Sequence, residues 1–90
     1  MLNTLTLQDF EPEQGQTIRV AGLPMQLVSA TPLRFPRPGV RSGFSLLFRA
    51  QSPAPLAQGQ HPVEHPRLGS MDIFLVPLGG EPAEFEAIFN

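Results

Sequence analysis

The run from Gly69 to Pro77 constrains the fold more than any other part of this sequence. It reads Gly-Ser-Met-Asp-Ile-Phe-Leu-Val-Pro, with β-branched and aromatic residues inside and Gly and Pro at its ends. A short apolar run bounded in this way is typical of a largely buried β-strand, and it is too short for a helix with one apolar face. The rest of the chain must therefore supply strands that cover it.

Further segments have the alternation or the composition of strands. They cover residues 17–20, 25–28, 43–49, 61–65 and 83–90. Between the first two, Gly22, Leu23 and Pro24 are expected to turn the chain. Pro62 and Pro66 are expected to break the strand at 61–65 at both ends, a pattern that suits the edge of a sheet because proline cannot donate to a ladder.

The run from Gly69 to Pro77 and the segment at 83–90 are predicted to form a hairpin, with a loop of about five residues centred on Gly80. The register that keeps apolar side chains on one face pairs Leu75 with Phe85, Ile73 with Ala87 and Met71 with Phe89. On the other face this register pairs Val76 with Glu84 and Phe74 with Glu86.

The N-terminal segment predicts a short helical turn. Thr6 followed by Asp9 has the spacing of a capping box, and Pro12 limits the turn to a few residues. Leu7 and Phe10, three residues apart, would share one face and plug the end of a sheet or barrel.

With 90 residues, the chain is expected to be a single β domain spanning 1–90. Its 11 Pro and 8 Gly are spread along the sequence, which indicates many short elements. The predicted fold is all-β and mainly antiparallel, a small barrel or sandwich of five or six strands with a short N-terminal helical turn.

Charge and cysteine content exclude several classes of function. There is no Cys, so disulfides and thiolate sites are excluded. The 6 basic residues are all Arg and the net charge is −2, which gives no general attraction to nucleic acid or to an anionic membrane. Neither a signal peptide nor a membrane-spanning run is encoded, so a cytoplasmic location is expected.

Two pairs of residues resemble chemical sites by type alone. On a strand, His61 and His65 would be attached about 13 Å apart, too far to share one metal ion, and surface or edge histidines are the preferred interpretation. Glu84 and Glu86 would hold carboxylates about 7 Å apart, which is a glycosidase-like spacing, but alternating Glu is also ordinary on a solvated strand. We therefore predict no catalytic, cofactor-binding or metal-binding residue, and no enzyme.

Four apolar side chains are predicted to point away from the core, and this is the least ordinary feature of the sequence. They are Leu47, Phe74, Val76 and Ile88. An exposed apolar face on neighbouring strands marks an interaction site unless the protein's own loops or Glu stems cover it.

A Pro-rich loop from Thr31 to Ser42 is a second candidate contact. The preferred interpretation is an extended loop with solvated Arg side chains and a tucked Phe. The functional hypothesis is a docking loop for an acidic partner, with Arg34, Phe35, Arg37 and Arg41.

Several short segments of the chain form a recognisable set. They are Leu5-Thr6-Leu7-x-x-Phe10, Gly15-Gln16-Thr17, Phe44-Ser45-Leu46-Leu47-Phe48, Gln58-Gly59, His65-Pro66-x-Leu68-Gly69, Phe74-Leu75-Val76-Pro77 and Phe85-Glu86-Ala87-Ile88-Phe89-Asn90. Together these segments resemble a bacterial domain-of-unknown-function family of small β proteins. The resemblance implies an uncharacterised protein encoded near phage-tail-like collar protein genes, and it transfers no catalytic residue and no cofactor.

The function expected from the sequence is a non-enzymatic protein-interaction or assembly module, with a protein partner or self-association. The resemblance would make it an accessory protein of a phage-tail-like structure. The alternative is a carrier that holds a small apolar ligand in the barrel interior, which needs a cavity where the first function needs a surface.

Overall fold

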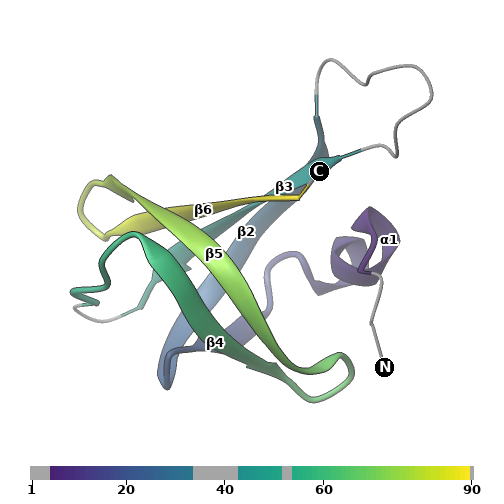
Figure 1. Ribbon diagram of the computed structural model, residues 1–90, viewed down its shortest axis with the longest axis horizontal. Helices are drawn as coiled ribbons and strands as arrows, with labels where there is room; N and C mark the ends of the chain where they lie inside the picture. Colours follow the sequence, from purple (N-terminus) through teal and green to yellow (C-terminus); the bar gives the residue numbers. More distant parts are fainter. Residues whose placement is uncertain (1–4, 34–42, 52–53, 90) are drawn as a thin grey trace.

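The computed structural model describes residues 5–33, 43–51 and 54–89. A short α-helix and a 3-10 turn come first, and strands follow to the C-terminus (Figure 1). The elements are α1 (Leu7–Phe10), η1 (Glu11–Glu13), β1 (Thr17–Val20), β2 (Leu23–Pro32), β3 (Phe44–Ala50), β4 (Gly59–His65), β5 (Gly69–Gly79) and β6 (Glu84–Phe89).

The strands form a closed antiparallel barrel in the order β1-β2-β3-β6-β5-β4. Closure removes the exposed sheet edges that would otherwise pair with other chains. The shortest seam is the one between β1 and β4, which pairs Arg19 with Glu64 and Val20 with Val63. The structure thus confirms the all-β prediction and selects the barrel over the sandwich.

The core lies inside the barrel and is built by alternation along each strand. On β3, Phe44, Leu46 and Phe48 are buried while the residues between them are partly exposed, as their parity predicts. The same pattern on β5 and β6 places Ile73, Leu75, Phe85 and Ala87 inside. The buried hydrophobic residues pack as one cluster.

The N-terminal turn closes one end of the barrel, as predicted. The backbone N–H of Thr6 donates to Asp9 Oδ2 at 2.8 Å, one of the two hydrogen bonds of a capping box. Phe10 is buried, and its ring centroid lies 5.9 Å from that of Phe44 and 6.0 Å from that of Phe89. An aromatic cluster therefore fills this end beneath α1.

The first hairpin turns one residue earlier than expected. Ala21 and Gly22 form the turn, with φ of 51° and 77°, and Leu23 and Pro24 already belong to β2. Two residues with positive φ match the right-handed twist of the flanking strands better than a longer turn does.

Pro62 lies inside β4 rather than at its end, so the expectation that it breaks this strand is wrong. It pairs with Asp72 of β5, and its carbonyl accepts a hydrogen bond of 2.7 Å from the backbone N–H of Ala21. In an antiparallel strand the N and the C=O of one residue face the same neighbour, so the missing N–H of Pro62 faces β1. The β1–β4 ladder ends there, and the strand loses little by carrying proline.

The register of the last hairpin differs from the predicted one by two residues. Phe85 lies opposite Pro77 rather than Leu75, and Glu86 lies opposite Val76 rather than Phe74. The ladder is irregular between Pro77 and Gly79, so β5 runs further before the chain turns. A shift of two preserves which side chains face inward, and for that reason the predicted core residues are correct although their partners are not.

Candidate interaction surface

The outer surface of β3, β6 and β5 carries the four apolar residues singled out in the sequence. Glu86 of β6 lies opposite both Leu47 of β3 and Val76 of β5, which makes one row across three strands. Ile88 lies two residues further along β6 and is 53 % exposed, and Phe74 lies two residues from Val76 on β5 and is 48 % exposed. We call Leu47, Phe74, Val76, Glu86 and Ile88 the outer apolar face.

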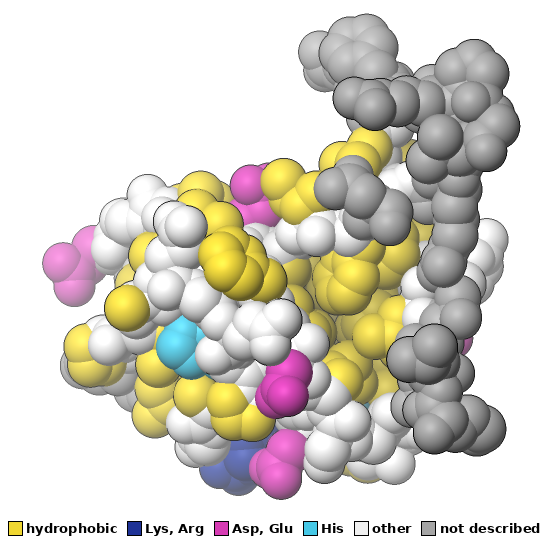
Figure 2. Space-filling view, in the orientation of Figure 1, with side chains coloured by type: hydrophobic (Ala, Val, Ile, Leu, Met, Phe, Trp, Pro, Cys, Tyr) yellow, Lys and Arg dark blue, Asp and Glu magenta, His cyan; other side chains and the backbone are white. Residues whose placement is uncertain are grey.

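The structure brings these side chains onto one surface without covering them. Leu47, Val76 and Glu86 are half-buried, whereas Phe74 and Ile88 are exposed. Figure 2 shows hydrophobic side chains on the outer surface of the strands nearest the viewer, interrupted by acidic groups. Large apolar side chains gathered on one exposed surface are typical of an interaction site.

One ion pair borders the outer apolar face. Arg49 on β3 lies opposite Glu84 on β6, and its Nε and Nη2 atoms donate to Glu84 Oε2 at 3.0 and 2.9 Å. The expected neighbour of Val76 was Glu84, and the register shift replaces it with Glu86. The second predicted contact, the docking loop of Arg34, Phe35, Arg37 and Arg41, lies outside the described residues.

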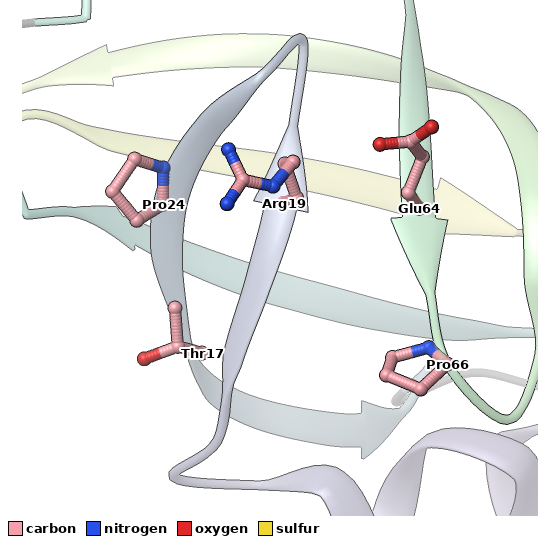
Figure 3. Close-up of a pocket in the computed structure, with 5 residues that line it drawn as sticks. All are labelled: Thr17, Arg19, Pro24, Glu64 and Pro66. Carbon is pink, nitrogen blue, oxygen red and sulfur yellow. The ribbon is translucent and has the colours of Figure 1, made fainter.

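A shallow groove opens where β1 and β4 separate below their short seam (Figure 3). Its volume is about 200 Å³, and it is lined by Thr17, Arg19, Pro24, Glu64 and Pro66. Arg19 Nη1 donates to the carbonyl of Gly22 at 3.0 Å, so its guanidinium leans over Pro24, away from Glu64. Both charged side chains are exposed to solvent.

A second pocket lies at the end of the barrel that α1 covers. Its volume is about 220 Å³, and it is lined by Leu5, Thr6, Leu7, Gln8, Pro32, Gly43 and Phe44. Leu5, Leu7, Pro32 and Phe44 are the apolar residues among them. The walls of this pocket therefore suit a small apolar group.

A polar cluster around the buried His65 fastens the N-terminal turn to the β4–β5 turn. His65 Nδ1 accepts hydrogen bonds of 3.0 Å from the backbone N–H groups of Arg67 and of Leu68. Its ring proton is therefore on Nε2, which donates to Glu13 Oε1 at 2.8 Å. Arg67 Nε donates to Glu13 Oε2 at 3.2 Å, and Arg67 Nη2 donates to the carbonyl of Asp9.

The cluster corrects the expectation that both histidines are surface or edge residues. His65 is 9 % exposed and ties three elements together, whereas His61 is partly exposed and its Nε2 lies 2.7 Å from the carbonyl of Ala57. Sequence reasoning missed Glu13 and Arg67 altogether. Glu13 approaches His65 and Arg67 only when η1 packs against the β4–β5 turn, and no local pattern signals this contact.

The charge of Glu13 is stabilised by this arrangement. The hydrogen bond from His65 holds the pKa of Glu13 below its usual value of 4.5, the hydrogen bond and charge of Arg67 act in the same direction, and burial opposes them. A carboxyl group whose pKa is lower in the folded state contributes stability above its unfolded pKa, and this contribution is lost as the pH falls through the folded value.

We expect Glu13→Gln to flatten the acid side of the stability profile. Between about pH 5 and pH 3, the free energy of unfolding of the wild type should fall more steeply than that of the variant. At neutral pH the variant should be the less stable of the two. Urea unfolding at several pH values measures both slopes, and parallel curves would show that Glu13 does not titrate differently in the folded protein.

The residues weighed as chemical sites do not converge. Glu84 is held by Arg49, and Glu86 lies between apolar neighbours on the same outer surface. In the described ranges, no three His, Asp or Glu side chains are grouped as metal ligands would be. Neither α1 nor η1, the helical elements that the structure describes, has the length and apolar character needed to cross a membrane.

Comparison with known proteins gives one family. The model of a domain of unknown function, DUF6916, matches residues 5–89. This range includes every described element of the barrel. Neither the curated proteins nor the solved structures give a match.

Proposed function

Because the chain belongs to the DUF6916 family of domains of unknown function, we propose its function from its own surface: a non-enzymatic protein-interaction or assembly module. The observation that carries this proposal is the outer apolar face, where Phe74 and Ile88 are about half exposed on neighbouring strands. Aromatic and aliphatic anchors of this kind supply most of the energy of protein–protein interfaces. The proposed occupant is a protein partner or a second copy of the chain.

The proposal also includes the assembly and the cellular compartment in which the chain acts. The resemblance seen in the sequence supports an accessory role in a phage-tail-like structure, in the bacterial cytoplasm. Such assemblies are built by contacts between folded subunits, and a small closed barrel offers a rigid surface for them. Rigidity favours binding because little conformational entropy is lost at the interface.

The test is a double variant, Phe74→Ser with Ile88→Ser. Tagged wild-type chain, produced in its native cells, is expected to recover a partner or to self-associate, and the double variant should lose this association by about tenfold or more. Co-purification with quantitative mass spectrometry measures the first, and sedimentation measures the second.

Leu78→Ser is the matched control, since Leu78 is a similarly exposed apolar residue (52 %) at the turn end of β5. It should leave the association unchanged. Full association of the double variant would refute the proposed surface. A wild-type chain that stays monomeric and recovers nothing would refute the function itself.

The second candidate function is a carrier of a small apolar ligand. The barrel interior is occupied by the core cluster, so the observation that favours this function is instead the pocket of about 220 Å³ at the α1 end. A carrier should take up a small apolar fluorescent dye there, and Leu7→Ser in the pocket wall should weaken the uptake. Dye binding that is unchanged in the Leu7→Ser variant would rule out the carrier function at this pocket.

A further inference from the structure

The chemistry of the partner follows from the residue at the centre of the outer apolar face, and this inference rests on the proposed function. Glu86 lies opposite both Leu47 and Val76 and is half-buried. Among the described residues, its carboxylate forms no hydrogen bond and no ion pair. Arg49, the cation that the described part of the chain places beside this surface, is already engaged by Glu84 at 2.9 Å.

An apolar partner would fit this surface poorly. Docking on Phe74 and Ile88 would also remove water from Glu86, and a desolvated carboxylate without a partner costs free energy. The other described charge on this side of β5 is Asp72, two residues from Phe74 and exposed, so the surface is acidic beyond its centre as well. The partner must therefore bring positive charge.

A second copy of the chain is disfavoured for a related reason. A two-fold symmetric contact brings the same patch against itself. With the axis through the centre of the outer apolar face, the carboxylates of two Glu86 residues would meet, and like charges brought together at an interface oppose association. The outer apolar face therefore favours a different protein over a second copy of the chain.

We propose that the outer apolar face binds an extended segment of another protein in which an arginine stands two residues from an apolar side chain. Glu86 and Ile88 are two residues apart on β6, which is about 7 Å along the strand. An extended partner repeats that spacing, so its arginine meets Glu86 while its apolar side chain packs on Ile88, and further apolar groups of the partner can reach Phe74. Arginine suits the site because its guanidinium forms two parallel hydrogen bonds with a carboxylate.

The probe is a pair of synthetic peptides. One has arginine at its centre, valine two residues to either side and threonine elsewhere, and the other has glutamine in place of the arginine. Titration of each into the isotope-labelled wild-type chain, followed by NMR, should shift the amides of β5 and β6 around the outer apolar face. The arginine peptide is expected to bind about tenfold more tightly at low salt, and added salt should reduce the difference.

Glu86→Gln tests the charge alone, because it keeps the shape of the side chain. In this variant the two peptides should bind equally, whereas Phe74→Ser with Ile88→Ser should weaken both. Equal binding to the wild-type chain, shifts at another surface, or no binding of either peptide would overturn the inference. Unchanged unfolding temperatures of the variants show that the losses come from the surface rather than from the fold.

The result for the wild-type chain alone separates this inference from the proposed function. If sedimentation shows a dimer that Phe74→Ser with Ile88→Ser dissolves, the outer apolar face binds a second copy. That outcome overturns the arginine-bearing partner and leaves an assembly function standing.

Discussion

Phe85→Ala is expected to lower the free energy of unfolding by about 3–5 kcal/mol. Phe85 is 1 % exposed, and it lies opposite Phe48 on one side and Pro77 on the other. Removing its ring leaves a cavity that three strands of a closed barrel cannot collapse to fill. Because small domains are stable by only about 5–15 kcal/mol, this loss is a large share of the total stability and should lower the unfolding temperature markedly.

Phe74→Ala is the control for this change. It removes the same ring from the outer surface of β5, where half of the side chain is already in water, and should cost less than about 1 kcal/mol. Urea unfolding followed by circular dichroism measures both variants. A loss below about 1 kcal/mol for Phe85→Ala would mean that the barrel interior is not closely packed at this position.

His65→Ala is expected to cost about 2–4 kcal/mol, the second largest effect. The change leaves two backbone N–H groups, those of Arg67 and Leu68, without their acceptor, and it leaves Glu13 without its donor. Each buried polar group that loses its partner costs about 1–3 kcal/mol. The N-terminal turn should also loosen, since Glu13 then holds only Arg67.

Two conservative variants separate the parts of this effect. His65→Asn places an amide oxygen near the position of Nδ1, so it should keep the β4–β5 turn and lose the contact with Glu13. His65→Gln reaches toward Glu13 and should do the reverse. Hydrogen exchange at the amides of Arg67 and Leu68 reports the turn directly, and equal protection in all three variants would contradict the assigned hydrogen bonds.

Most of the fold follows from local patterns in the sequence. The alternation at 43–49 and 83–90 predicts which side chains face inward, and the spacing of Thr6 and Asp9 predicts the N-terminal turn. The errors concern alignment between elements. A two-residue slip of β6 along β5 keeps every side chain on its face, so burial alone cannot distinguish the two registers.

The candidate site also has features that a single strand predicts and features that depend on how the elements align. The outward direction of Phe74 and Ile88 is a property of single strands and is predictable. The position of Glu86 between Leu47 and Val76 depends on the β3–β6 register and on the β5–β6 register together. The cluster of Glu13, His65 and Arg67 joins residues more than fifty positions apart, so it exists only in the folded barrel.

The most direct test of the outer apolar face is an NMR spectrum of the isotope-labelled chain with and without the associating species, whether a recovered partner or a higher concentration of the chain itself. Changes should concentrate at the amides of Leu47, Phe74, Val76, Glu86 and Ile88 and disappear in the Phe74→Ser, Ile88→Ser variant. Changes concentrated instead at the groove of Arg19 and Glu64, or around Phe44 at the α1 end, would contradict the account.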